Sequence, residues 1–250
     1  MGVRTTMSFS GHRSQTELVD ELLRRYGDNP GSRRLLRFWW KKHAWSAVVS
    51  GARGVKRGID IVAAGGALLC LWPLFAAVAI CIKLIDRGPV FFWQTRVGLW
   101  GREFRFPKFR SMVINAEVLK DKLLTQSHHT GSVTFKMRND PRVTWIGRII
   151  RKLSIDELPQ LWCVLCGDMS LVGPRPPLPR EVANYTLADR RRLEVTPGLT
   201  CIWQVSGRGD IPFPQQVELD RQYIESQSIW LDIRLLLETI PAVLWGKGAY

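Results

Sequence analysis

The chain has 250 residues, of which 46% are hydrophobic, so it is long and apolar enough for one large or two small domains with a buried core. Lys and Arg outnumber Asp and Glu by 36 to 22, and with 11 tryptophans this excess suits a surface that meets anionic lipid headgroups or phosphates, although nucleic acid fits the charge equally well. The five cysteines are odd in number, which argues against a disulfide framework, and the polar N-terminal residues offer no signal peptide, so we expect a reducing compartment.

Residues 1–50 are predicted to form a basic extension with amphipathic helices. Ser14 and Glu17 match a capping box, and Gly27 closes the short helix that would follow them. The next stretch, from Arg33 to Trp45, reads RRLLRFWWKKHAW and mixes cations with aromatic residues, as helices that lie in a membrane interface do. A basic face packed against another protein is the alternative.

A long uncharged segment follows from Ile61 to Ile82 and reads IVAAGGALLCLWPLFAAVAICI. It is long enough at helical rise to cross a hydrocarbon core of about 30 Å, but Pro73 near its middle would divide it into halves too short to span. Basic residues on both flanks favour the cytoplasmic side for both ends: Arg53, Lys56, Arg57, Lys83 and Arg87. Residues 51–87 are therefore predicted to form a re-entrant helix-break-helix, with a Pro-kinked span as the alternative.

Two strands and a terminal helix are predicted in the remainder. The stretches GPVFFWQTRVG (88–98) and REFRFPKF (102–109) read as the strands of a β-hairpin. Residues from Ile229 to Trp245 carry apolar side chains at helical spacing, with Ser228 as a plausible N-cap. This helix is too charged to span a membrane, and lying on the bilayer or covering the core are both open.

Two groups of metal-ligand residue types carry little weight. The polar stretch 127–134 reads as a surface loop, in which His128 and His129 are expected to be solvated. Cys163 and Cys166 form a C-x-x-C, but a single pair without a second pair or nearby histidines is weak evidence for zinc.

Asp156 and Glu157 stand side by side in the stretch LSIDELPQLW, residues 153–162. One interpretation is structural, because Ser154 and Glu157 have the spacing of a capping box at a helix start. Pro159 strains that interpretation, since a proline in the first turns removes a hydrogen-bond donor and crowds the preceding carbonyl. The charges around the motif favour a functional interpretation.

Cations gather around the two carboxylates, and acids are few there: the cations are Lys136, Arg138, Arg142, Arg148, Arg151, Lys152, Arg175 and Arg180. A positive field favours the ionised carboxylate, so Asp156 and Glu157 are expected to be charged at neutral pH and to be poor general acids. Charged carboxylates among arginines favour a nucleophile or metal ligand that acts on a phosphate, with Mg²⁺ bridging carboxylate and diphosphate. Arg175 lies between Pro174 and Pro176, which restrict its backbone.

Several motifs, in one order from Val55 to Tyr250, resemble those of the monotopic phosphoglycosyl transferases, also called bacterial sugar transferases or undecaprenyl-phosphate sugar phosphotransferases. They are KRGID, GPVFFWQTRVG, FPKFRSM, SIDELPQLW, GDMSLVGPRP, TPGLT, WQVSGR and GKGAY. This many separate motifs in sequence make the resemblance highly specific, although the first fifty residues lie outside it. The GKGAY ending is similar to exopolysaccharide-type members, for which UDP-galactose or UDP-glucose is the expected donor.

The resemblance implies a two-step transfer. A UDP-sugar gives its phosphosugar to an aspartate with loss of UMP, and a polyprenyl phosphate such as undecaprenyl phosphate then accepts it, as the first membrane step of exopolysaccharide or other glycoconjugate synthesis. Carried onto this chain, Asp156 is the nucleophile, and Glu157 with Asp156 holds Mg²⁺. The implied substrate-binding residues are Arg151, Arg175, Lys108, Arg110 and Arg208. Lys56, Arg57 and Pro73 would anchor and turn the membrane helix at the headgroups.

The resemblance also implies an α+β, monotopic membrane protein at the cytoplasmic face of the bacterial inner membrane. The re-entrant helix of residues 51–87 would precede a catalytic domain of residues 88–250 that contains the hairpin and interfacial helices. Membrane lipids are expected partners, nucleic acid is not, and a homodimer is left open. Three positions depart from the family pattern, so no role is carried over to them: Trp72 in place of serine, Thr196 in place of arginine and Cys201 in place of glycine.

Two other functions stay open at this point. A membrane-anchored basic binding protein without catalysis would account for the arginines but would leave Asp156 and Glu157 without a role. A conventional glycosyltransferase would move the sugar without its phosphate, and would release UDP in place of UMP.

Overall fold

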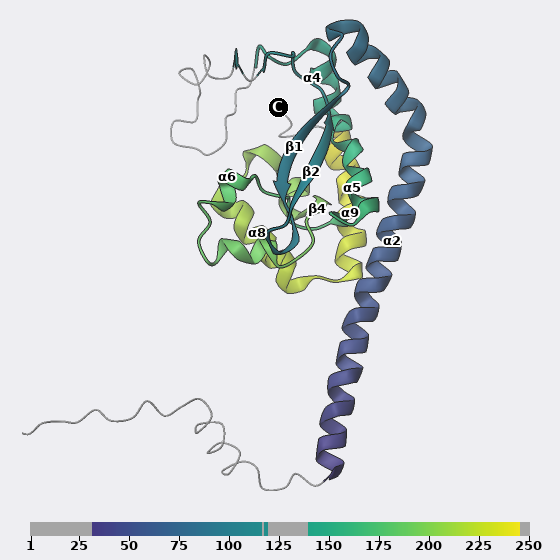
Figure 1. Ribbon diagram of the computed structural model, residues 1–250, viewed down its shortest axis with the longest axis vertical. Helices are drawn as coiled ribbons and strands as arrows, with labels where there is room; N and C mark the ends of the chain where they lie inside the picture. The colour runs from purple at the N-terminus through teal and green to yellow at the C-terminus, as the bar shows by residue number, and fades with distance from the viewer. Residues whose placement is uncertain (1–31, 117, 120–139, 246–250) are drawn as a thin grey trace, which may run out of the picture. The chain divides into compact units, whose positions relative to one another are not determined.

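The computed structural model describes residues 32–116, 118–119 and 140–245 (Figure 1). The helix predicted after Ser14, the loop with His128 and His129, and the closing GKGAY lie outside the described residues. The chain divides into two compact units, residues 1–53 and 54–250. The first helix, α2 (Ser32–Asp86), begins in one unit and ends in the other, and it confirms the helix predicted from Arg33 to Trp45.

Helix α2 is continuous over 55 residues, with Pro73 inside it. The structure therefore differs from the expected helix-break-helix, because the ribbon bends toward its C-terminal end but is not interrupted there (Figure 1). A proline removes one donor and crowds one carbonyl, and a helix accommodates both by bending. Among the described helices, α2 alone is long and apolar enough to cross a membrane, over Gly51–Ile85.

The predicted hairpin is confirmed. Strand β1 (Phe91–Val97) pairs antiparallel with β2 (Glu103–Phe109), and the turn between them contains the short helix η1 (Leu99–Gly101). Trp100 and Gly101 both have a left-handed backbone, with φ of 56° and 82°, which allows the chain to reverse there. Phe104 and Phe106 alternate with exposed residues along β2 and are buried, so one face of the hairpin lies on the core.

Short helices and a two-stranded parallel sheet follow the hairpin. In chain order they are α4 (Trp145–Lys152), η3 (Ile155–Gln160), α5 (Leu161–Cys166), β3 (Ser170–Val172), α6 (Pro179–Val182), η4 (Asp189–Leu193), β4 (Gly198–Thr200), α7 (Ile202–Ser206), η5 (Arg208–Asp210), α8 (Phe213–Ser226) and α9 (Ile229–Trp245), with β3 paired to β4. The α+β class is thus as expected. Helix α9 has the predicted bounds, and the Ser228 Oγ accepts a hydrogen bond from the Leu231 amide (3.2 Å) as an N-cap does.

Two apolar clusters hold the part of α2 that belongs to the second unit against the rest of that unit. The larger cluster joins Ala64 of α2 to the hairpin, α5, β3, α8 and α9 through residues that include Phe106, Val164, Tyr223 and Leu235. The smaller cluster joins the last turns of α2 to the end of the hairpin and to α4, through Val78, Ile82, Phe109 and Ile150. One face of the apolar helix is therefore part of the core, both before and after Pro73. Helix α9 covers the core with Leu235 and leaves Leu237 exposed on its opposite side.

Polar contacts reinforce this packing at the start of the second unit. The Lys56 Nζ lies 2.5 Å from Asp232 Oδ2 in α9 and donates to the Val172 carbonyl (3.1 Å). The Tyr223 hydroxyl donates to the other oxygen of Asp232 (2.7 Å) and also to the Val172 carbonyl (3.1 Å). Lys56 thus binds α9 and the end of β3, and the headgroup contact expected of it stays a prediction.

The next residues of the KRGID motif bind the protein in the same way. Arg57 Nη2 donates to the carbonyl of Leu165 (2.7 Å), and its Nη1 donates to that of Val164, at the end of α5. Asp60 is 5% exposed and accepts a hydrogen bond from the Leu171 amide (3.0 Å). Its role in joining α2 to β3 was not predicted, because an acidic residue one turn after two cations carries no such signal in the sequence alone.

Candidate active site

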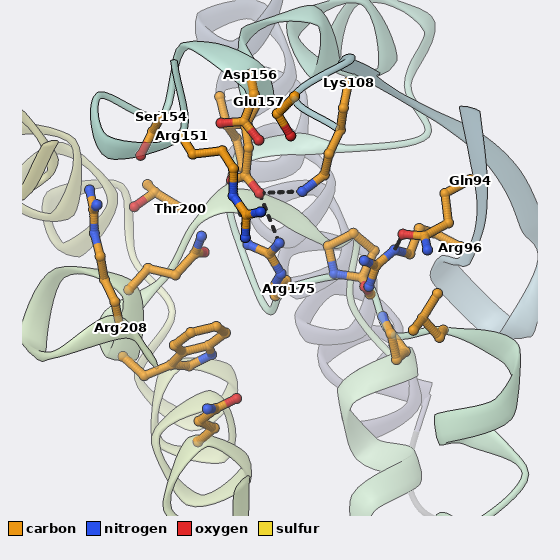
Figure 2. A pocket seen from close by; sticks show the side chains of 18 of the residues that line it. Gln94, Arg96, Lys108, Arg151, Ser154, Asp156, Glu157, Arg175, Thr200 and Arg208 are labelled. Carbon is orange, nitrogen blue, oxygen red and sulfur yellow. Dashed lines mark hydrogen bonds and ion pairs between the residues drawn. The ribbon is translucent and has the colours of Figure 1, made fainter. Parts of the chain in front are cut away.

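A cavity of about 1160 Å³ brings together all seven of the residues predicted to be catalytic or to bind substrate. They are Lys108, Arg110, Arg151, Asp156, Glu157, Arg175 and Arg208, and they come from β2, α4, η3, η5 and the connections between elements. Figure 2 shows most of them pointing toward one space. Lys56, Arg57 and Pro73 do not line this cavity.

Helix η3 presents the two carboxylates. Ser154 before it has a left-handed backbone (φ 53°), and its side chain makes no capping bond; instead, the Glu157 amide donates to the Ser154 carbonyl (3.2 Å). The capping-box interpretation is therefore wrong for the side chains. Pro159 is tolerated because this segment is a short 3₁₀ helix, in which fewer residues require a backbone donor.

Glu157 is held by two cations from different elements. Its Oε1 lies 2.6 Å from the Lys108 Nζ and 2.8 Å from the Arg175 Nη2 (Figure 2). Burial works against the charge on Glu157, but Arg175 and Lys108 outweigh it and hold the pKa of this carboxyl well below its usual range. Glu157 is thus ionised at neutral pH, as expected, and its orientation is fixed by charge-assisted hydrogen bonds.

Asp156 lies beside this ion-pair cluster but forms no ion pair with any described residue. It is 8% exposed and lines the cavity. Burial, opposed mainly by the charge of Lys108, raises the pKa of Asp156 to about 6. The expected direction of the pKa shift was wrong, because loss of water outweighs the positive field, yet the carboxyl is still mostly ionised at pH 7. A buried carboxylate whose oxygens accept no hydrogen bond from the described residues is suited to attack an electrophile.

The loop of residues 173–178 positions Arg175 beside Glu157. Pro174 and Pro176 on either side of it are fully buried, so the backbone around Arg175 has little freedom. The negative charge of Glu157 raises the pKa of Arg175, against the effect of burial. The rigid turn that the two prolines predict is therefore part of the site.

Three further arginines of the predicted set line the cavity. One buried nitrogen of Arg110, Nη1, has no hydrogen-bond partner among the described residues. The charge of Arg151 in α4 opposes the rise in the pKa of Asp156. Arg208 has a left-handed backbone (φ 51°), a strained conformation for a residue with a side chain, and burial lowers its pKa while Glu157 opposes that shift. Together with Lys108 and Arg175 they surround Asp156 and Glu157 with positive charge.

The sequence did not single out Gln94 and Arg96, which also line the cavity. Both belong to β1, and Arg96 Nε donates to Gln94 Oε1 (3.0 Å). Residues two apart in a strand share a face, so the predicted strand could have indicated that Gln94 and Arg96 lie on one polar face. It could not have indicated whether that face lies toward the site or toward solvent. Of the departures from the family pattern, Cys201 is fully buried and its Sγ donates to Gln204 Oε1 (3.1 Å), and Thr196 lies outside the cavity wall.

The donor chemistry of the site fits magnesium. Among the described residues, no group of three or more His, Cys, Asp or Glu side chains could hold a metal by itself, and buried Cys163 donates its thiol to the Arg105 carbonyl (3.4 Å). Mg²⁺ is typically bound by one or two carboxylates together with substrate phosphates and water. Asp156 and Glu157 are two hard oxygen donors of that kind, beside cations that would receive the phosphates.

Comparisons with known proteins point to one family. The sequence model of the family described as "Bacterial sugar transferase" matches residues 51–246. The chain is 50% identical over 196 residues to "Galactosyl transferase CpsE" of Streptococcus agalactiae, a match that covers 78% of this chain and 43% of that protein. It is 41% identical over 198 residues to "Exopolysaccharide production protein ExoY" of Rhizobium meliloti, covering 78% of this chain and 88% of ExoY.

A third relative is "Undecaprenyl-phosphate galactose phosphotransferase" of Salmonella typhimurium, which is 43% identical over 203 residues. That match covers 80% of this chain and 42% of the relative. The chain thus spans less than half the length of two of these curated relatives but most of ExoY. The matched region contains every residue of the cavity described above.

Proposed function

Because the chain belongs to the bacterial sugar transferase family, we propose that it transfers a phosphosugar from a UDP-sugar to a polyprenyl phosphate such as undecaprenyl phosphate. The products are a polyprenyl-diphosphate-sugar and UMP. The name of the Salmonella relative includes both the lipid and galactose, and the name of ExoY includes exopolysaccharide production. We assign this chain to the same step of exopolysaccharide or other glycoconjugate synthesis.

The first step forms a covalent intermediate on Asp156. One Asp156 oxygen attacks the phosphorus next to the sugar, and the bond from that phosphorus to the bridging oxygen of the diphosphate breaks. The bridging oxygen leaves with its electron pair as part of UMP. Lys108, Arg175, Arg151 and Arg208 lie around this carboxylate and would stabilise the charge on the phosphoryl oxygens.

The second step regenerates the carboxylate. A phosphate oxygen of the lipid attacks the same phosphorus, and the bond from phosphorus to the Asp156 oxygen breaks. The phosphosugar then belongs to the lipid, and Asp156 recovers its charge. Because acyl phosphates are activated, the protein needs to orient the lipid phosphate more than it needs to activate it.

Glu157 and Asp156 are the residues that would hold Mg²⁺. The ion, when bound, would neutralise diphosphate oxygens and the departing phosphate. Lys108 and Arg175 hold Glu157 in one orientation. The direction in which its carboxylate would bind the ion is therefore set by the protein before the substrate binds.

The observation that carries this proposal is the contrast between the two adjacent carboxylates. Glu157 is engaged by two cations, whereas Asp156, at the wall of a cationic cavity within the family's matched region, has no ion pair with a residue that the structure describes. A non-catalytic binding protein has no need of a buried carboxylate that raises the free energy of the fold. A surface built for nucleic acid is disfavoured for the same reason.

We further propose that α2 is re-entrant and that the protein is monotopic, at the cytoplasmic face of the bacterial inner membrane. Lys56 and Ile82 both contact the same compact unit, although about 40 Å of straight helix would separate them. A helix that crossed a hydrocarbon core of about 30 Å would place its ends on opposite sides. The lipid-facing side of α2 would be its exposed large apolar side chains: Ile61, Val62, Leu69, Trp72, Ile80 and Leu84.

The decisive experiment measures the nucleotide released from a panel of UDP-sugars by the full chain in liposomes that contain a polyprenyl phosphate. UMP is expected with UDP-galactose or UDP-glucose, and none is expected from the D156N variant. Release of UDP would indicate a conventional glycosyltransferase and overturn the proposal. The R105Q variant is a matched control, because Arg105 on β2 is exposed and lies outside the cavity wall.

The covalent step has its own test. Parent protein incubated with UDP-sugar and Mg²⁺, but without lipid acceptor, is expected to carry a hexose-phosphate adduct on the peptide that contains Asp156. Mass spectrometry of a rapid digest detects the adduct. If an active protein never carries the adduct, the proposed phosphosugar transfer stands but the covalent intermediate on Asp156 is contradicted.

A further inference from the structure

A buried cation without a carboxylate partner lies in the wall of the candidate active site. Arg96 of β1 is 9% exposed, and its guanidinium carbon lies 5.1 Å from the centre of the Phe106 ring. None of the described carboxylates forms an ion pair with it. Its Nε donates to Gln94 Oε1 (3.0 Å), and its Nη1 donates to the Pro176 carbonyl (2.9 Å).

This placement is electrostatically unfavourable. Burial, together with the like charge of Arg175, lowers the pKa of Arg96 to about 10. A neutral side chain at this position would avoid both effects, and Phe106 could still pack against its aliphatic part. The side chain is thus expected to supply something that a neutral residue could not supply as well, and its shortest hydrogen bond is the one to the Pro176 carbonyl (2.9 Å).

That bond completes a set around Arg175. The carbonyl of Pro174 accepts from the Gly198 amide, and that of Pro177 accepts from the Val97 amide, both at 2.9 Å. The carbonyl of Pro176, between them, accepts from Arg96. Two of these donors are backbone amides, which persist through most substitutions. The third is a side chain, so the Pro176 contact is the one that depends on which residue occupies position 96.

The consequence reaches the carboxylates directly. Pro176 follows Arg175, so the orientation of the Pro176 peptide group helps to set the direction in which the Arg175 side chain leaves the backbone. Arg175 in turn lies 2.8 Å from the Glu157 oxygen. A bidentate cation such as arginine is sensitive to direction as well as distance, because its donors lie in one plane.

We propose that Arg96 is a positioning residue, which fixes the loop of residues 174–177 so that Arg175 meets Glu157 and a substrate phosphate in the productive direction. The phosphate part of this inference rests on the proposed function. The part that concerns the loop does not, because it depends only on contacts within the protein.

The kinetic test is a double-mutant cycle on UMP release, with the parent, R96Q, R175K and the R96Q/R175K double variant in the same liposomes. R96Q is expected to lower kcat about tenfold in the parent and by no more than about twofold in the R175K background, because the two residues act as one unit. R105Q is the matched control and keeps the parent rate. Full multiplication of the two single losses, or an R96Q variant as active as R105Q, overturns the proposal.

A second measurement needs no turnover. The Leu178 amide donates to the Glu181 side chain (2.8 Å) immediately after the proline loop, and hydrogen exchange at this amide reports how firmly the loop is held. Exchange is expected to be faster in R96Q than in the parent or in R105Q. If R96Q fails to fold, R96K provides the same comparison, because a lysine cannot bond to Gln94 and Pro176 in the planar arrangement of arginine.

The two measurements separate the possible failures. If the parent releases no UMP from any UDP-sugar, the proposed function fails, whereas the exchange experiment still decides whether Arg96 holds the loop. If the parent is active and exchange at Leu178 is unchanged in R96Q, the positioning role fails and the proposed function stands.

Discussion

Asp156 and Glu157 are neighbours in the chain and line the same cavity, yet only Glu157 forms ion pairs with other described residues. Glu157 shares an oxygen between Lys108 and Arg175, whereas Asp156 is buried without an ion pair to any described residue. Their pKa values accordingly move in opposite directions, down for Glu157 and up to about 6 for Asp156. Replacing each carboxylate by its amide should therefore have opposite effects on stability.

For Asp156, removal of the charge is expected to stabilise the fold while it abolishes UMP release. The raised pKa means that the folded protein disfavours the ionised form, so stability is lost as the pH rises from the unfolded pKa toward about 6. D156N is thus expected to gain about 1 to 3 kcal/mol at pH 7, by thermal melting in detergent. The gain should vanish below about pH 4, and a D156N variant less stable than the parent at pH 7 would contradict this account.

For Glu157, the amide variant is expected to be less stable. E157Q would leave Lys108 and Arg175 facing one another without a carboxylate between them, at a cost of about 1 to 3 kcal/mol after allowance for their partial exposure. Because the folded pKa of Glu157 is depressed, its contribution is fully present above the unfolded pKa and is lost progressively as the pH falls from there through the folded pKa. The same melting experiment measures it, and a gain in stability would show that the cations do not depend on Glu157.

Activity should also depend on pH through Asp156. The nucleophile must be ionised, so kcat/KM for the UDP-sugar is expected to fall about tenfold per pH unit well below a midpoint near pH 6. UMP release measured between pH 5 and pH 8 gives the profile, with melting curves at each pH to exclude unfolding. A flat profile over this range would place the pKa of the essential carboxylate elsewhere, and R105Q should match the parent.

The contact between Lys56 and Asp232 is expected to stabilise the attachment of α2. D232N leaves a partly buried lysine without its carboxylate, and the one remaining side-chain oxygen cannot serve both Lys56 and the Tyr223 hydroxyl as the two Asp232 oxygens do, so we expect a loss of about 1 to 3 kcal/mol. Adding K56M removes the unpaired charge, so the double variant should lose less than the sum of the two single variants. Melting of all four proteins tests the coupling, and strict additivity would mean that the pair contributes nothing as a pair.

Much of the fold was accessible from the sequence where patterns are local. The stretches 88–98 and 102–109 predicted the hairpin, and the apolar spacing after Ser228 predicted α9 to its observed bounds. Pro73 predicted a disturbance in α2 and left a break or a kink open. Which of the two forms depends on packing along both halves of the helix, and the helix continues through the proline.

The site was predicted less evenly. The seven site residues implied by the resemblance all line the cavity. Six of them lie in the quoted motifs, and Arg151 lies five residues before Asp156. They did not supply the direction of the pKa shift at Asp156, which depends on burial that no local pattern reveals. Arg96 and Asp60 were missed for a related reason, since their partners lie 80 and 111 residues away along the chain.

The packing of α2 also bears on how this protein can be handled. Ala64, Val78 and Ile82 belong to the interior of the domain, so residues 54–86 are not a detachable anchor. A fragment that starts after Asp86 would expose the apolar surfaces those residues cover and leave Asp232 without its lysine. Truncation is therefore expected to give an aggregating product, and a water-soluble version would have to keep the helix and change only its outward side chains.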